Sequence, residues 1–119
     1  MKYIVSILAI LLSIAALWWW RSSPPPVPSL TGFAQCLADK KVTMYGAEWC
    51  PHCQNQKKLF GDAWKFIPYV ECPQDPKRCI DLGIKGYPTW IFADGTTLEG
   101  EQSLATLDEK SGCRLPSHY

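Results

Sequence analysis

Two cysteines with a proline and a histidine between them, in the stretch AEWCPHCQNQKKLF at residues 47–60, constrain the fold of this chain most strongly. The short apolar segment VTMYGA that leads into them is predicted to be a buried strand. Pro51 favours the first turn of a helix, because its missing N–H would have no partner there in any case. The sequence therefore predicts a strand running into a helix with Cys50 at its start. The core side of this helix is expected to carry Cys53, Phe60, Ala63 and Trp64.

The start of a helix is a reactive place for a cysteine. A thiol attacks only as its thiolate, and the free backbone N–H groups and positive dipole end of a helix stabilise that anion. His52 adds positive charge nearby when it is protonated. Because a stabilised thiolate makes the dithiol form more stable and the disulfide more oxidising, Pro51 and His52 favour a donor of disulfides over a strong reductant.

The N-terminal segment predicts export of the rest of the chain. Residues 3–20 carry no charge and would span roughly 27 Å as a helix, close to the ~30 Å hydrocarbon core of a bilayer. The three tryptophans at 18–20 resemble an interfacial aromatic belt, with Arg21 just beyond it. We expect residues 1–21 to be a single-pass signal anchor in the cell membrane. A cleavable signal peptide is the alternative, and both place the C-terminal domain on the periplasmic or extracytoplasmic side.

A proline-rich linker, SSPPPVPS at residues 22–29, separates this segment from one small domain at residues 30–119. Apolar spacing predicts a helix at 30–41, and β-rich runs predict strands at 42–47 and 67–72. A short helix would follow Asp75, and Asp94-Gly95 would turn a hairpin within 89–100. Ser103 would cap a last helix that stops at Gly112. We expect a four-stranded mixed sheet flanked by helices, in an α/β fold.

Charge and cysteine spacing exclude several function classes. The net charge is only +1, which gives no support for nucleic-acid binding. Six cysteines in 119 residues indicate an oxidising compartment unless they bind metal. Cys72 and Cys79 have a spacing unlike that of a second zinc knuckle, and the only histidine besides His52 is His118. We therefore expect no metal and no organic cofactor, with a non-catalytic zinc or structural module as the alternative of another class.

Two motifs resemble the thioredoxin superfamily over roughly residues 30–113. AEWCPHC is similar to its active-site turn, with the Pro-His dipeptide of DsbA-type periplasmic oxidases, and GYPTW at 86–90 is similar to its cis-proline loop. The stretches MYGAEWCPHCQNQKKLFG, YVECP and GYPTWIFADG are most similar to the thioredoxin-like domains associated with bacterial vitamin K epoxide reductase homologues. The resemblance implies a thioredoxin-like fold and a redox-active pair.

The resemblance also implies a substrate groove beside the cysteines. Pro88 would follow a cis bond from Tyr87 and shape the groove, and Trp49 would offer an apolar docking surface next to Cys50. One position departs from the family, because Met44 replaces the buried acid that usually assists the second cysteine. Glu48 is the nearest carboxylate in sequence, and we expect it near the surface.

The remaining four cysteines are predicted to have structural roles. Cys72 and Cys79 bracket a short polar loop and are expected to form a structural disulfide worth roughly 2.5 kcal/mol, with a second redox pair as the alternative. Cys36 and Cys113 form either a third bridge or two buried thiols, because the sequence alone cannot place their Cα atoms.

These features predict a membrane-anchored thiol–disulfide oxidoreductase. Cys50 would form mixed disulfides with exported proteins, Cys53 would resolve them, and His52 would tune Cys50. The resemblance suggests reoxidation by a quinone-reducing membrane partner of the vitamin K epoxide reductase or DsbB type. The alternative within the same fold is a tethered reductase or isomerase.

Overall fold

The structure is a computed structural model that describes residues 1–21 and 30–119, so the predicted linker at 22–29 lies outside the described residues. Helix α1 (Lys2–Arg21) has no buried residue. With 20 residues it is about 30 Å long. It is long and apolar enough to cross a membrane, and a signal sequence near an N-terminus has the same properties.

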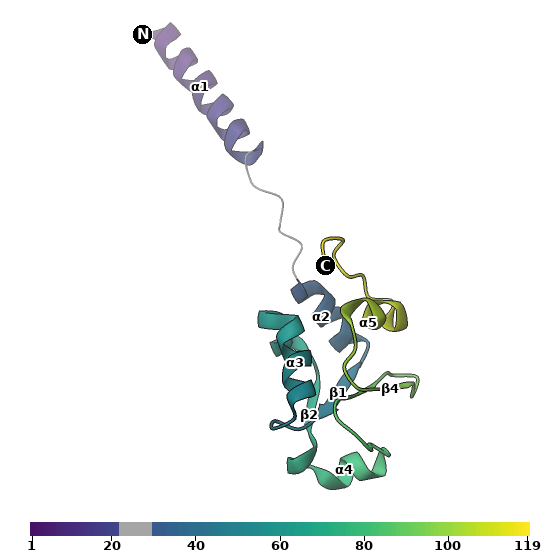
Figure 1. Cartoon of the computed structure of the whole chain (residues 1–119). Coiled ribbons are helices and arrows are strands. Elements are labelled where there is room, and N and C mark those ends of the chain that lie inside the picture. The colour runs from purple at the N-terminus through teal and green to yellow at the C-terminus, as the bar shows by residue number, and fades with distance from the viewer. Residues whose placement is uncertain (22–29) are drawn as a thin grey trace.

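A four-stranded mixed sheet forms the centre of the domain (Figure 1). Its strands are β1 (Thr43–Gly46), β2 (Tyr69–Glu71), β3 (Thr89–Ile91) and β4 (Thr97–Glu99). They lie in the order β2-β1-β3-β4, with β1 and β2 parallel and the other two pairs antiparallel. The predicted mixed sheet is confirmed, although each strand is shorter than the apolar segment that predicts it.

The helices follow in the predicted order. They are α2 (Leu30–Asp39), α3 (Pro51–Phe60), α4 (Pro76–Asp81) and α5 (Leu104–Ser111), with short 3-10 helices η1 (Gly61–Phe66) and η2 (Cys72–Gln74). One expectation is wrong, because Trp64 does not extend the core face of α3 but lies in η1. The reason is Gly61, whose positive φ of 51° suits glycine and ends the α-helix after Phe60.

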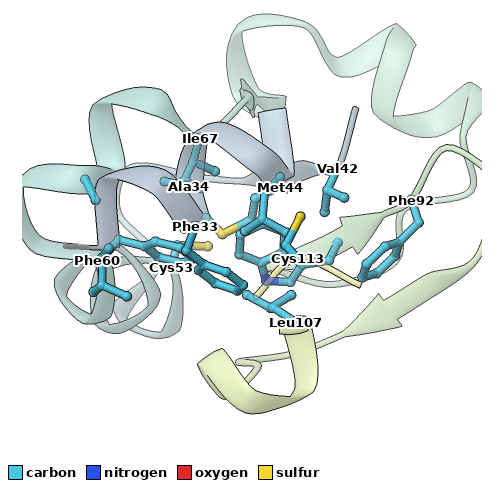
Figure 2. Close-up of a cluster of buried hydrophobic side chains, with 14 of the residues drawn as sticks. Phe33, Ala34, Val42, Met44, Cys53, Phe60, Ile67, Phe92, Leu107 and Cys113 are labelled. Carbon is cyan, nitrogen blue, oxygen red and sulfur yellow. The ribbon is translucent and has the colours of Figure 1, made fainter. Parts of the chain in front are cut away.

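Most of the core lies on one face of the sheet (Figure 2). Met44 of β1 and Trp90 of β3 are fully buried there, against side chains from α2, α3 and α5. The residues of these helices that reach the cluster include Phe33, Ala34, Leu37, Cys53, Phe60 and Leu107. Three helices therefore share this face, and α3 is fixed to the sheet along the side that carries Cys53.

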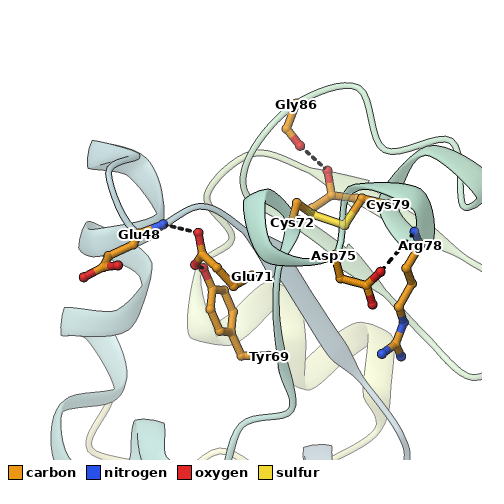
Figure 3. Close-up of a disulfide and its surroundings, with 9 residues drawn as sticks. Glu48, Tyr69, Glu71, Cys72, Asp75, Arg78, Cys79 and Gly86 are labelled. Carbon is orange, nitrogen blue, oxygen red and sulfur yellow. Dashed lines mark hydrogen bonds between the residues drawn. A yellow bond between two sulfur atoms is a disulfide. The ribbon is translucent and has the colours of Figure 1, made fainter.

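The opposite face of the sheet carries a smaller cluster. Tyr45 points to this face because side chains alternate along a strand, and it packs with Cys72 and Cys79. Figure 3 shows these two cysteines joined beside the short helix α4. The division into two clusters puts Met44 and Gly46 of β1 on the face that meets α3.

Candidate active site

Cys50 lies where β1 turns into α3, as the sequence predicts. It is the N-cap residue, Pro51 is the first residue of the helix, and the Cys50 amide donates a 3.1 Å hydrogen bond to the Ala47 carbonyl. The Gln54 side-chain amide donates to the Glu48 carbonyl at 2.9 Å, which ties the turn to the helix. Only 6% of Cys50 is exposed, so a partner must dock closely to reach its sulfur.

The loop before β3 faces the Cys50 sulfur. The Tyr87–Pro88 peptide bond is cis, and Cys50 Sγ lies 3.7 Å from the Tyr87 carbonyl oxygen in hydrogen-bonding geometry. The loop is held by a hydrogen bond of its own, since Thr89 Oγ1 donates to the Gly86 carbonyl at 2.7 Å. The tertiary structure thus brings together Cys50 and Pro88, which are far apart in the sequence.

Cys53 lies one turn into α3 and is fully buried. The pKa of the Cys53 thiol is raised to about 11, mainly by burial and also by the neighbouring Cys50. A backbone hydrogen bond from Ala47 and the charge of Lys57 act in the opposite direction. Cys53 is therefore held as a neutral thiol without direct access to water, whereas Cys50 lies at the N-cap of α3.

His52 points away from the core and is engaged by an acid that the sequence does not single out. Its Nδ1 lies 2.6 Å from Glu101 Oε1, and the same oxygen accepts a 3.2 Å hydrogen bond from Asn55. These two hydrogen bonds lower the pKa of the exposed Glu101 carboxyl. Glu101 follows β4 and is 49 residues from His52, so no local pattern relates the two.

An apolar surface lies beside Cys50. Trp49 is 68% exposed, and its ring contacts that of Tyr87 edge to face, with ring centroids 6.1 Å apart. The position predicted for substrate docking is therefore a pair of aromatic side chains next to the cis bond.

Met44 is buried and Glu48 is near the surface, as the sequence predicts, and each is next to a residue of β2. Met44 is fully buried and pairs in register with Tyr69 of β2. Glu48 is exposed, and its backbone N–H donates to Glu71 Oε1 at 2.8 Å (Figure 3). Sequence reasoning missed Tyr69 and Glu71, although their position on the strand next to β1 was a usable signal.

The other four cysteines are paired. Cys36 of α2 is bonded to Cys113 beyond α5, and Cys72 is bonded to Cys79. Cys50 and Cys53 are both free thiols. Of the six cysteines, the structure leaves only the pair at the start of α3 able to exchange. Within residues 1–21 and 30–119, no group of three or more His, Cys, Asp or Glu side chains is arranged to hold a metal.

Comparison with known proteins gives relatives for the domain. The chain is 47% identical over 81 residues to the thiol-disulfide oxidoreductase LTO1 of Arabidopsis thaliana, a match that covers 60% of this chain and 21% of that protein. It is 34% identical over 73 residues to the thioredoxin domain-containing protein 5 homolog of Drosophila melanogaster, covering 51% and 18% respectively. No family model matches. The chain thus spans about a fifth of the length of these relatives.

The sheet order and the helix that follows Cys50 agree with the arrangement expected from the sequence. The expected α/β fold, a four-stranded mixed sheet flanked by helices, is confirmed. Among solved structures, a mutant thioredoxin from Halobacterium salinarum superposes with a TM-score of 0.47 at 22% identity, covering 76% of this chain and 90% of the thioredoxin. Of the two relatives, one is named as a thiol-disulfide oxidoreductase and the other for a thioredoxin domain.

Proposed function

We propose that the protein is a thiol–disulfide oxidoreductase in which Cys50 exchanges disulfides with other proteins and Cys53 resolves the mixed disulfide. The observation that carries this proposal is the difference between the surroundings of Cys50 and those of Cys53, which lies one helical turn away. Cys50 caps the helix and lies 3.7 Å from the carbonyl beside the cis bond, whereas Cys53 is a fully buried thiol with a raised pKa. The Cys50 sulfur would react with the partner protein, and the Cys53 sulfur would then attack the mixed disulfide from within the domain.

We further propose that the direction is oxidation of exported proteins. The support for this direction is the position of Cys50 as the N-cap of α3, because the positive end of a helix favours a thiolate and a favoured thiolate makes a disulfide more oxidising. The presence of two other disulfides in the domain agrees with an oxidising compartment. Helix α1 would hold the domain at the bilayer and raise its effective concentration near a membrane partner.

We propose as that partner a quinone-reducing membrane protein of the vitamin K epoxide reductase or DsbB type. An oxidase must be reoxidised after each transfer, because donating the disulfide leaves Cys50 and Cys53 as two thiols. The support for this partner is the motif resemblance together with the apolar helix.

Trapping tests the exchange reaction. In a Cys53→Ser variant of the full chain expressed in membranes, mixed disulfides on Cys50 cannot be resolved from within and should accumulate as adducts that thiol reductants release. Cys50→Ser is the matched control and should trap nothing. A Cys53→Ser protein that forms no more adducts than Cys50→Ser would refute the proposal. Identification of the adducts would show whether exported proteins and a quinone-reducing partner are among them.

The reduction potential tests the direction. Equilibration of the Cys50–Cys53 pair with glutathione should give a value between about −180 and −120 mV, the range of isomerases and of DsbA. A value near the −270 mV typical of thioredoxin would refute the oxidase direction and support the reductase alternative.

A further inference from the structure

Cys53 must lose its proton before it can attack a mixed disulfide, and it must regain one when the disulfide opens again. Its thiol is fully buried and has a pKa raised to about 11, so little thiolate forms spontaneously at neutral pH. Met44 is also fully buried and offers no acid or base. The proton therefore needs another route between the Cys53 sulfur and solvent.

Gly46 opens a space on the face of β1 that meets α3, and two groups occupy it. A Cβ at residue 46 would lie 2.7 Å from Cys53 Sγ, 3.3 Å from Tyr69 Cε2 and 3.4 Å from the Tyr69 hydroxyl oxygen. The sulfur and the hydroxyl therefore both lie within 3.4 Å of one point. Tyr69 reaches this point from β2, where it pairs with Met44 across the parallel strands.

The Tyr69 hydroxyl leads onward to a carboxylate. It donates a 2.5 Å hydrogen bond to Glu71 Oε2, and Glu71 Oε1 accepts a 2.8 Å hydrogen bond from the backbone N–H of Glu48 (Figure 3). Glu71 ends β2 at the edge of the sheet and is half-buried, next to the exposed Glu48. The Tyr69 hydroxyl and Glu71 therefore connect the space beside the Cys53 sulfur with the surface.

The charges around Tyr69 decide how it can act. Burial, the hydrogen bond to Glu71 and the negative charge of Glu71 all raise the pKa of the Tyr69 hydroxyl. The Cys53 and Cys50 thiolates would raise it further, and the ammonium of Lys57 lies 4.1 Å from the centre of the Tyr69 ring. A free phenolate is disfavoured by the nearby acid. Tyr69 is therefore suited to accept one proton as it releases another.

We propose that Tyr69 and Glu71 form the proton relay of Cys53, in place of a buried acid at position 44. This inference rests on the proposed exchange reaction. In resolution, the Cys53 S–H proton moves to the Tyr69 oxygen as the Tyr69 proton moves to Glu71 Oε2. The Cys53 thiolate attacks Cys50 Sγ, the Cys50–Cys53 bond forms, and the bond to the partner sulfur breaks.

The electron pair and negative charge leave with the partner as its thiolate, and Glu71 returns its proton to water. When the pair donates its disulfide, the steps run in reverse. A substrate thiolate attacks Cys50, Cys53 leaves as a thiolate, and it takes a proton from Tyr69, which is restored from Glu71. Proton and charge balance in both directions.

Two-step kinetics with the small aromatic disulfide dithiobis-nitrobenzoate can isolate the Cys53 step. The full chain is used in detergent, with Cys50 and Cys53 reduced and the other disulfides intact. Attack by Cys50 releases one coloured thiolate at a rate that depends on reagent concentration. Attack by Cys53 on the resulting mixed disulfide releases a second coloured thiolate, at a rate that does not depend on reagent concentration. The variants are Tyr69→Phe and Glu71→Gln, because both keep shape and remove only the proton-carrying group.

Matched controls remove the same groups elsewhere. Tyr45→Phe deletes a hydroxyl on the opposite face of the sheet, and Glu99→Gln deletes an exposed carboxylate on β4. We expect Tyr69→Phe and Glu71→Gln each to slow the second release at least about tenfold and to leave the first release unchanged. The defect should shrink as pH rises, since hydroxide then takes over the deprotonation. Neither control should change the second release or its pH profile.

The outcomes separate the relay from the exchange reaction. Second-release rates in Tyr69→Phe and Glu71→Gln that equal the controls at every pH would overturn the relay and leave the exchange reaction standing. A defect in Tyr69→Phe alone would overturn the role of Glu71. A wild-type protein that gives no second release would instead refute the proposed function. If Tyr69→Phe does not fold, Glu71→Gln still decides, because it retains acceptor and donor atoms at the same place.

Discussion

Replacing Gly46 by alanine should distort the site at its tightest point. The added Cβ would lie 2.7 Å from Cys53 Sγ, whereas atoms in favourable contact are about 3.5–4.0 Å apart. The sulfur or the strand must therefore move by about 1 Å. Neither can do so freely, because Cys53 is fully buried and β1 is hydrogen-bonded on both sides by β2 and β3.

The expected magnitude follows from this overlap. Overpacking a buried site by one methyl group costs about 1–3 kcal/mol, and we expect about 2 kcal/mol for Gly46→Ala. A domain of this size unfolds with only about 5–10 kcal/mol, so the loss is a substantial fraction. It should lower Tm by about 10 °C, since each kcal/mol shifts Tm by about 4–8 °C in a domain this small.

Gly32→Ala is the control, because it makes the same substitution at a site where we expect the free energy of unfolding to rise. Gly32 lies in α2, and a Cβ there would meet nothing within 4 Å. Alanine is a better helix former than glycine, so this change should raise the free energy of unfolding by up to about 1 kcal/mol. Both variants are made in a Cys50→Ser background, in which Cys53 stays a thiol without added reductant and the other disulfides persist.

Thermal unfolding of the full chain in detergent, followed by circular dichroism, measures the difference. Gly46→Ala should melt well below the background protein and Gly32→Ala at or above it. If Gly46→Ala melts as high as Gly32→Ala, the close approach of Cys53 to β1 does not constrain the site, and the reasoning fails.

Three further predictions concern groups around the site. Opening the Cys36–Cys113 disulfide with two alanines should cost about 4 kcal/mol, because the bridge closes a loop with a sequence separation of 77; a Tm unchanged within error would contradict this. Gln56→Leu should lower the free energy of unfolding by about 2–3 kcal/mol, because the buried Gln56 amide is hydrogen-bonded to the Trp90 indole N–H and to the Gln102 backbone. An unchanged denaturant midpoint would show that these hydrogen bonds make no net contribution to stability. His52→Ala should raise the pKa of the Glu101 carboxyl toward its ordinary value in a carboxyl NMR titration, because the His52 hydrogen bond is the largest cause of its lowering. The stabilisation from the His52–Glu101 pair is fully present above the ordinary carboxyl pKa and is lost as pH falls through the lowered pKa of Glu101.

Local signals in the sequence predict the order of the elements correctly. Ser103 caps α5 through a 3.0 Å hydrogen bond from the Thr106 amide, and Gly112 ends the helix with a φ of 70°. Gly95 turns the hairpin between β3 and β4 with a φ of 85°. These predictions succeed because capping and turn geometry depend on neighbours in the chain. The extent of α3 was overestimated because apolar spacing continues past Gly61, where the backbone does not.

The sequence by itself determined that Cys50 would begin a helix, that Cys53 would turn inward and that a strand lacking an acid at Met44 would precede them. These properties arise from residues within a turn or two of one another. Only the tertiary structure decided what stands opposite them. The register of β1 with β2 brings Tyr69 to Met44 and carries Glu71 to the Glu48 amide, and the path beyond β4 brings Glu101 to His52. Such contacts depend on strand register and loop closure across 20 to 50 residues, so no local pattern in the sequence encodes them.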